Sequence, residues 1–295
     1  MTSTKPAAVR NLLRHLRRPG PAIELPSAGD VEALVPSRAH GALLLDFYAP
    51  DDVREALARY GVADRLARRG FGPPQVELET GDPDHHVVRV HAPRAGRTWL
   101  LGEAFLRAAD FETDAPFAEA LHGRRMRMLY IQWLRLQDPS RPFAPDRPRL
   151  PGQDHPGLGI GREVMAMFLG MADRLRLAGI VSCPEFAHNA VLYKRTFRFF
   201  DPAAQGRFEA LEAAAAGLRL ADFAWAVEQG RVIDQETGRP FRWTREEMVC
   251  PTSPLLREHF ESAVYHRRAD EARRAARCRI EPPSAPRADA ATSPD

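Results

Sequence analysis

The sequence has few cysteines, and none of them forms a pairing or metal-binding motif. Its 295 residues include three cysteines, Cys183, Cys250 and Cys278, and no two of them form a CxxC arrangement. An odd number at wide spacing argues against a disulfide framework and against a structural zinc site. A chain of this length buries a sufficient core without covalent or metal cross-links. We therefore expect no metal, and a protein of the reducing cytoplasm.

Long hydrophobic runs are also missing. No apolar stretch approaches the roughly 20 residues that a membrane-spanning helix needs, so we expect no membrane partner. The first 30 residues contain arginines where a secretory signal has a continuous apolar core. They predict a basic N-terminal arm with a short helix over residues 9–17, followed by a loop.

Lysine is almost absent. Only Lys5 and Lys194 are lysines among the 42 basic residues, and 39 acidic residues leave a net charge of +3. Arginine binds phosphates and carboxylates through two parallel hydrogen bonds, which lysine cannot make. The arginines are nevertheless spread over a chain that is also rich in alanine, proline and glycine, as GC-rich bacterial coding produces. Because the net charge is small, we do not expect nucleic acid as a partner.

The sequence does contain clear strand and helix patterns. Residues 41–48 (GALLLDFY) predict a buried strand, and a helix is predicted to follow over residues 53–69. Between residues 75 and 137, apolar and polar residues alternate between turn signals, which predicts three or four antiparallel strands. Residues 138–156 contain six prolines and predict an extended loop.

The second half begins as an α/β pattern and then becomes helical. Residues 161–179 predict a helix, which a short strand, a second short helix and a last strand follow. Beyond them an Ala-rich helix with a weak point at Gly217 is predicted, and Ser253 is the expected cap of a helix over residues 254–277. The predicted parts are a basic arm (1–30), an α/β domain (31–202), a helical extension (203–280) and a disordered tail (281–295).

A glycine-rich stretch precedes the helix at residue 161. It reads Gly157-Leu158-Gly159-Ile160-Gly161-Arg162. Glycines let the backbone approach a ligand closely, and the free N–H groups of a helix start attract phosphate. The stretch lacks the GK[ST] of a P-loop and the G-x-G-x-x-G spacing of a dinucleotide-binding loop. It predicts a phosphate-binding loop of another kind, with a tight entry to a packed helix as the competing interpretation.

Two motifs resemble the Gcn5-related N-acetyltransferase (GNAT) superfamily, and the chain looks like a divergent member. Gly159-Ile160-Gly161 at a helix start is similar to the G-x-G or G-x-A of the family's cofactor loop. Residues 188–197 (HNAVLYKRTF) resemble the family's second short helix, N-x-x-A-x-x-L-Y-x-x-x-G-F. The resemblance covers about residues 75–202. The order of strand, loop, helix, strand, short helix and strand also agrees with it.

The resemblance implies a fold and a ligand. The implied fold is GNAT-like α/β (α+β), a mixed and mainly antiparallel sheet flanked by helices, here with a helical C-terminal extension. The implied donor substrate is acetyl-CoA or another acyl-CoA, whose pyrophosphate would lie on the glycine loop and whose pantetheine arm would follow the strand at Leu134–Gln137. The cofactor-binding residues that it implies are Leu136, Gln137, Gly157, Leu158, Gly159, Ile160, Gly161, Arg162 and Asn189.

The resemblance also suggests catalytic groups. Tyr193 occupies the position where many members place a tyrosine that protonates the departing thiolate, and a phenol with a pKa of about 10 has that chemistry. Glu103, in the middle of the predicted sheet, is the candidate base, with an outward-facing carboxylate as the competing interpretation. His155 and His188 flank the two motifs and are weaker candidates. Cys183 is interpreted as a packing residue.

The predicted function is acyl-CoA-dependent transfer of an acyl group, an acetyl group in the first instance, to an amine. One alternative is a transferase that uses longer acyl-CoA or acyl carrier protein donors. Another is a GNAT-fold binding module without catalysis, with the basic helix Arg267–Arg279 as its interaction element. Pro156, Asn189 and Thr196 differ from the family pattern, which keeps this last alternative open. The acceptor and the oligomeric state, a dimer included, stay open.

Overall fold

The computed structural model describes residues 43–282. The predicted basic arm, and all but the first two residues of the predicted tail, lie outside the described residues. The described chain divides into two compact units. The first contains residues 43–109, 129–136 and 158–171, and the second contains residues 110–128, 137–157 and 172–282.

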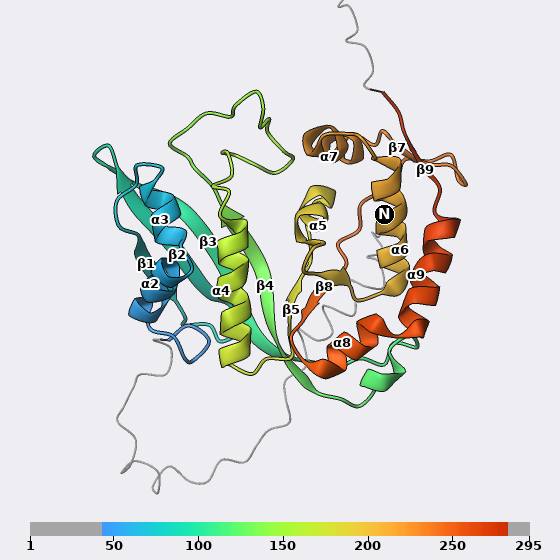
Figure 1. Ribbon diagram of the computed structural model, residues 1–295, viewed down its shortest axis with the longest axis horizontal. Coiled ribbons are helices and arrows are strands. Elements are labelled where there is room, and N and C mark those ends of the chain that lie inside the picture. Colours follow the sequence, from blue (N-terminus) through green and yellow to red (C-terminus); the bar gives the residue numbers. More distant parts are fainter. Residues whose placement is uncertain (1–42, 283–295) are drawn as a thin grey trace, which may run out of the picture. The chain divides into compact units, whose positions relative to one another are not determined.

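A seven-stranded sheet organises the fold, with the strand order β1-β2-β3-β4-β5-β8-β6 (Figure 1). The pairs β1/β2, β2/β3, β5/β8 and β6/β8 are antiparallel, and β7 and β9 form a separate antiparallel pair. This confirms the predicted fold class, a mainly antiparallel sheet flanked by helices. The strands are β1 (Gln75–Glu79), β2 (His86–Arg94), β3 (Arg97–Phe111), β4 (Met126–Leu136), β5 (Gly179–Ser182), β6 (Arg198–Phe199), β7 (Val232–Asp234), β8 (Met248–Pro251) and β9 (Cys278–Ile280).

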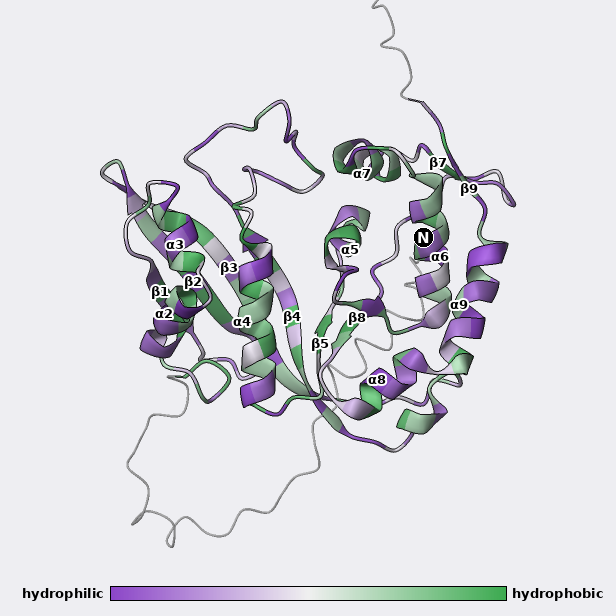
Figure 2. Cartoon of the chain, in the orientation of Figure 1, coloured by the Kyte–Doolittle hydropathy of each residue, from purple (hydrophilic) through white to green (hydrophobic). Residues whose placement is uncertain are grey.

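The helices confirm most of the predicted helical segments. Within residues 43–282, no helix combines the length and the apolar character that crossing a membrane requires. Figure 2 shows the contrast between the hydrophobic α7 and the hydrophilic α9. The helices are α2 (Pro50–Arg59), α3 (Val62–Ala67), α4 (Gly161–Arg174), α5 (Ala187–Tyr193), α6 (Pro202–Ala214), α7 (Leu220–Glu228), α8 (Pro254–Glu261) and α9 (Ala263–Ala275), with a 3-10 turn at Glu119–Leu121.

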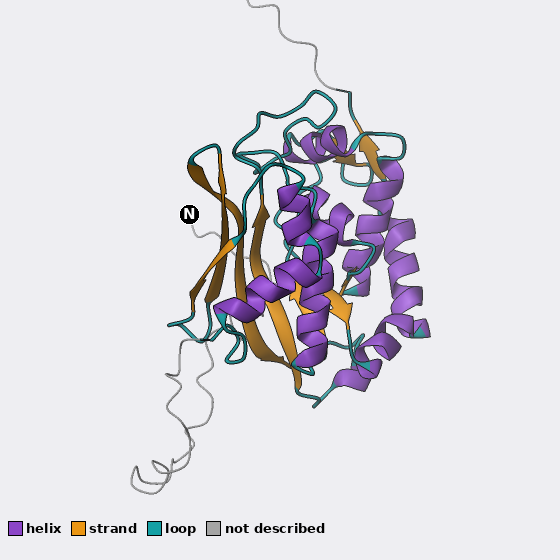
Figure 3. Ribbon diagram, turned by 60° about the vertical axis from the view of Figure 1, so that its left-hand side comes forward, coloured by secondary structure: helices purple, strands orange, loops and turns teal. Residues whose placement is uncertain are grey.

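In the first unit, helices α2, α3 and α4 lie on one face of strands β1–β4 (Figure 3). The strand registers place Val88 opposite Ala104 and His86 opposite Leu106, so these four side chains share one face of the sheet. All four are buried, which is expected of the face that the helices cover. The opposite face of the same strands carries Glu103 and its charged neighbours, described below.

Two predictions for the start of the first unit are wrong. Residues 41–48 do not form a strand: the described part is a tight turn in which Leu45 and Asp46 have φ angles of 53° and 58°. A hydrogen bond of 2.8 Å from the Leu45 N–H to His86 Nδ1 holds this turn. The single helix predicted over residues 53–69 is two helices, because Gly61 takes a left-handed φ of 76° between α2 and α3. Apolar composition identified the buried side chains but not the turn.

In the second unit, β8 lies between β5 and β6. Its register pairs Val249 with Val181 on one side and with Arg198 on the other. Residues 248–251, which sequence analysis assigned to a helical extension, are therefore part of the sheet. The segment between β6 and β8 contains α6 and α7, and the predicted weak point between them is confirmed, with Gly217 at φ 85°.

The C-terminal helices follow their capping residues. Ser253 accepts a hydrogen bond from the Leu256 N–H, which confirms the predicted start of α8. The predicted helix over residues 254–277 is nevertheless divided at Ser262. This residue is extended, at φ −66° and ψ 144°, and its side chain caps α9 by accepting from the Tyr265 N–H. A second serine cap inside an apolar periodic stretch explains the division.

Candidate functional site

The glycine loop is held by its two apolar residues and presents its glycines to solvent. Leu158 and Ile160 are buried at 1% and 3% exposure, whereas the three glycines between and beside them are exposed. The Leu158 N–H donates to the Leu136 carbonyl at 3.3 Å, and Gln137 forms a bridge with Gly157. This alternation leaves the loop's backbone available to a ligand, as a phosphate-binding loop requires.

The loop enters α4 through a residue that requires glycine. Gly159 has a φ of 64°, in the left-handed region, and Gly161 begins the helix with no atom within 4 Å of a side chain added there. The start of α4, where unpaired first-turn N–H groups and the positive end of the helix dipole occur, is therefore open around Gly161. Arg162, in the first turn, is exposed. The local geometry suits an anion.

A second arginine, which sequence reasoning missed, lies beside the loop. The Arg69 Nη2 atom is 3.5 Å from the position that a Cβ would take on Gly159. Arg65, from the same region of the chain, pairs with Glu163 in the first turn of α4 at 2.7 Å. Burial raises the pKa of Glu163, but hydrogen bonds from its own backbone N–H and from Arg65 outweigh this and lower it. The only sequence signal for Arg69 was a basic end to a predicted helix.

Glu103 lies on β3 between two arginines, Arg89 of β2 and Arg135 of β4. Its Oε1 accepts from Arg89 Nε at 3.1 Å and its Oε2 accepts from Arg135 Nη2 at 2.9 Å. Arg89 also reaches Glu77 and Glu79, so a ladder of alternating charges crosses β1 to β4. The side chain of Glu103 is 12% exposed. A proton taken from a substrate would therefore compete with Arg89 and Arg135 for the carboxylate of Glu103.

Tyr193 and Asn189 both belong to α5. Tyr193 is the last residue of the helix and is half-buried, and burial raises the pKa of its phenol. Its ring centroid lies 5.6 Å from that of Phe197. The Tyr193 phenol therefore retains its proton at neutral pH, as a proton donor must.

Asn189 is not the cap of α5, because Phe186 holds that position.

The weaker candidates have distinct environments. His188 is 3% exposed, its Nδ1 has no hydrogen-bond partner, and burial lowers its pKa to about 4. Burial raises the pKa of the Cys183 thiol to about 12, which excludes a reactive thiolate and suits a packing residue. His155 is half-buried in the proline-rich loop. Among residues 43–282, no group of three or more metal-ligating side chains occurs.

The two units contain different members of the predicted site. Leu136, Glu103 and the loop from Leu158 to Arg162 belong to the first unit. Gln137, Gly157, Asn189 and Tyr193 belong to the second. Within each unit the structure brings together Leu136 with Leu158 and Gln137 with Gly157.

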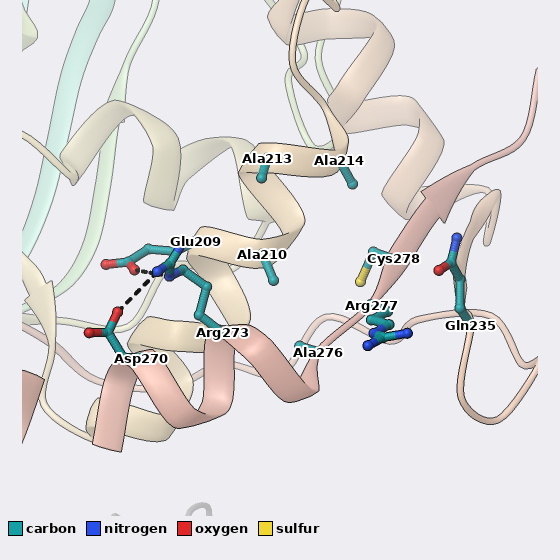
Figure 4. Close-up of a pocket in the computed structure, with 10 residues that line it drawn as sticks. All are labelled: Glu209, Ala210, Ala213, Ala214, Gln235, Asp270, Arg273, Ala276, Arg277 and Cys278. Atoms are coloured by element: carbon teal, nitrogen blue, oxygen red, sulfur yellow. Dashed lines mark hydrogen bonds and ion pairs between the residues drawn. The ribbon is translucent and has the colours of Figure 1, made fainter. Parts of the chain in front are cut away.

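A separate hollow of about 700 Å³ lies beside α6 and α9 (Figure 4). Arg273 extends toward Glu209 and Asp270 at one end, with N–O distances of 3.9 and 3.1 Å. Arg277 and Cys278 lie at the other end, and the hollow is also lined by alanines of α6 and by Ala276, the residue that follows α9. None of the predicted site residues lines this hollow.

Comparisons with known proteins give little further information. No protein-family model matches the sequence, and no curated protein matches it. Among solved structures, the chain is similar to "AtaT complexed with acetyl-methionyl-tRNAfMet" at 12% sequence identity, over 53% of this chain and 80% of that chain, with a TM-score of 0.26. A similarity of this extent carries no conclusion about activity or ligands.

Proposed function

We propose that the chain is an acyl-CoA-dependent N-acyltransferase of the GNAT type, acting in the cytoplasm on an amine. The observation that carries this proposal is the exposed glycine backbone between β4 and α4, with Gly159 in the left-handed region. Arg162 and Arg69 supply positive charge to the same loop. The element order β4, loop, α4, β5, α5, β6 supports the proposal, because it is the order that the sequence resemblance implies.

Each predicted residue has a role in this proposal. The N–H groups of Gly157 and of residues 159–162, with Asn189, bind the diphosphate, and Leu136 and Gln137 border the pantetheine arm. The acyl-CoA supplies an activated thioester. Tyr193 donates the proton that the departing thiolate takes, and its phenol is in the protonated form at neutral pH. Glu103 is a candidate proton acceptor, in competition with its two arginines.

Calorimetry and thermal denaturation with acetyl-CoA and longer acyl-CoAs test the binding step. We expect binding to raise the melting temperature, since the ligand binds the native state. Arg69→Gln and Arg162→Gln should each weaken affinity about 10-fold to 100-fold, as loss of a charge-assisted hydrogen bond does. Arg68→Gln is the matched control, because Arg68 is exposed and adjacent to Arg69. No shift with any acyl-CoA would exclude the proposed donor.

A binding module without catalysis is the second candidate. The ion pairs of Glu103 favour it, because a carboxylate held by two guanidinium groups is a poor proton acceptor. Tyr193→Phe separates the two candidates. In a transferase this variant binds acetyl-CoA normally and loses turnover, whereas a module shows no turnover in either form. Unchanged turnover would remove Tyr193 from the mechanism.

A further inference from the structure

The hollow beside α6 and α9 lies wholly within the second unit. Its lining residues come from α6, from the turn after β7, from the second half of α9 and from the three residues that follow α9. The two helices touch at Gly206, where a Cβ would lie 2.1 Å from the Ala269 carbonyl oxygen. Further along α6 the lining residues include Ala210, Ala213 and Ala214, whose short side chains leave space. The resulting volume of about 700 Å³ is in the range of small-ligand sites, about 300–1,000 Å³.

One end of the hollow has an excess of negative charge. Glu209 of α6 and Asp270 of α9 both pair with Arg273, at N–O distances of 3.9 and 3.1 Å (Figure 4). Glu209 also accepts a hydrogen bond from the uncharged amide of Gln205 at 2.8 Å. Two carboxylates and one guanidinium leave this end with one net negative charge. A cationic group of a ligand would neutralise it.

The other end of the hollow is formed by a guanidinium and an amide. The Gln235 N–H donates to the Arg277 carbonyl at 2.7 Å. Since Asp234 pairs with Cys278, the register places Gln235 opposite Arg277, with both side chains on the same side of the pair. Among the described residues, no hydrogen bond or ion pair reaches the Arg277 guanidinium or the Gln235 side-chain amide. Two such donors side by side suit a carboxylate.

The other charged groups of this region have partners of their own. Asp234 accepts two backbone N–H groups of its own turn, at 2.9 and 3.4 Å. Arg279 pairs with Glu281 at 2.7 Å. Burial and the charge of Asp234 raise the pKa of Cys278, so the thiol that lines the hollow is neutral. The positive charge of Arg277 is therefore available to a ligand.

We propose that the hollow binds a short peptide with free ends, its ammonium at the end formed by Glu209 and Asp270 and its carboxylate at Arg277. The two charges of the ligand then complete the pairing at both ends, and small side chains fit against the alanines between them. The hollow shares no residue with the proposed acyl-CoA site, and peptide binding does not depend on the acyltransfer.

The spacing along the chain limits the length of the peptide. From Asp270 to Ala275, the last residue of α9, the helical rises add up to about 7.5 Å. The two steps from Ala275 to Arg277 pass through the extended Ala276 and add at most about 7 Å. The Cα atoms of Asp270 and Arg277 are therefore at most about 14 Å apart. Since each residue of an extended peptide spans about 3.3–3.6 Å, peptides of about two to four residues fit.

Calorimetry with dialanine, trialanine and tetraalanine tests the site. At least one of these peptides should bind with a Kd of about 1 mM or below. The N-acetylated form and the C-terminal amide of that peptide each lack one end charge and should bind about 10-fold or more weakly.

Variants at Arg277 locate the peptide on the chain. Arg277→Gln should weaken binding about 10-fold or more, and Arg277→Lys should recover part of the affinity, because it keeps the charge but not the two parallel hydrogen bonds. Arg274→Gln is the matched control and should bind as the wild type does, because Arg274 is an exposed residue of α9 that does not line the hollow.

The contrary outcomes are distinct. No binding of any of the three peptides at about 10 mM would overturn the proposal. Equal binding of the acetylated form would show a site for anions only, equal binding of the amide would show a site for cations only, and either would overturn the proposed zwitterion. Equal affinity of Arg277→Gln and the wild type would place the peptide elsewhere. Because acetyl-CoA is left out of these measurements, failure of the proposed acyltransfer would not affect them.

Discussion

Gly159 and Gly161 stand two residues apart in one loop and differ in what they require. At Gly159 a side chain would have to adopt a φ of 64°, which costs an L-residue about 1–2 kcal/mol. At Gly161 the backbone is helical and space is open around an added Cβ. The conformation of the loop requires glycine at residue 159. At residue 161 the conformation does not require glycine, and the absence of a side chain only leaves the backbone accessible.

Gly159→Ala should therefore lower the free energy of unfolding by about 1–2 kcal/mol in urea denaturation, because the strain appears only in the folded state. Gly161→Ala is the matched control. It should leave stability unchanged or raise it slightly, since alanine is the better helix former. Equal effects of the two substitutions would show that the left-handed conformation at residue 159 is not required.

Glu103→Gln should destabilise the first unit by about 1–3 kcal/mol, because it removes the charge that pairs with Arg89 and Arg135. The Nε of Arg135 is already buried without a partner, so little else can satisfy this guanidinium. Glu77→Gln removes a more exposed carboxylate from the same Arg89 and should change stability by less than about 0.5 kcal/mol. Chemical denaturation of both variants measures the free energy of unfolding. An equal loss of stability in both would contradict the claim that the ion pairs of Glu103 stabilise the first unit more than that of Glu77.

Sequence reasoning at this scale found residues whose role follows from local conformation. The spacing of Gly157, Gly159 and Gly161 before a helix was enough to predict an accessible backbone loop. It could not find Arg69, because the approach of that side chain to Gly159 depends on how α3 packs near α4.

At the scale of elements, two helices contain a glycine at a close contact. In α6, a Cβ on Gly206 would lie 2.1 Å from the Ala269 carbonyl oxygen of α9 and 2.8 Å from the Arg273 backbone nitrogen. In α4, a Cβ on Gly170 would lie 2.0 Å from the Tyr60 hydroxyl. The first obstacle is helix backbone, and the second is the end of a side chain that can rotate.

Gly206→Ala should cost about 1–3 kcal/mol of unfolding free energy, because α6 and α9 would have to separate. Gly170→Ala should be within about 1 kcal/mol of the wild type, since Tyr60 can move and alanine has the higher helix propensity. Thermal melts of both variants provide the comparison. A neutral Gly206→Ala would mean that α6 and α9 approach less closely than described.

Sequence reasoning about elements succeeded where one segment decides its own structure. The caps and glycines near Ser253 and Gly217 marked real helix boundaries. It failed at residues 41–48, where an apolar stretch forms a turn held by His86, a residue far along the chain. It also failed to place residues 248–251 in the sheet, because four apolar residues do not identify their partners.

At the scale of the whole molecule, two buried groups give opposite dependences of stability on pH. Burial lowers the pKa of His188 to about 4, so its contribution is present above about 6.5 and is lost as pH falls toward 4. Burial raises the pKa of Glu247 to about 7, so its contribution is present below about 4.5 and is lost as pH rises through 7. Between about pH 4.5 and 6.5 the two effects oppose each other.

In the wild type the two opposing dependences of stability on pH partly cancel, and single variants should therefore show each of them separately. Relative to the wild type, Glu247→Gln should gain stability as pH rises from 4.5 to 6.5, and His188→Phe should lose it, each by up to about 1.4 kcal/mol per pH unit. Urea midpoints at several pH values measure this. His266→Phe is the control, because His266 is exposed and its replacement should leave the slope unchanged. Parallel curves for all four proteins would contradict the burial of both groups.

The strands β6 and β8 pair with each other but are synthesised at different times. β6 pairs with β8, yet the ribosome completes β6 and the helices α6 and α7 before it makes residues 248–251. A nascent chain that ends before residue 248 therefore exposes the edges of β5 and β6 that β8 will later join, and exposed strand edges associate with other chains. The β6 edge of the second unit therefore stays unpaired until residues 248–251 have been made.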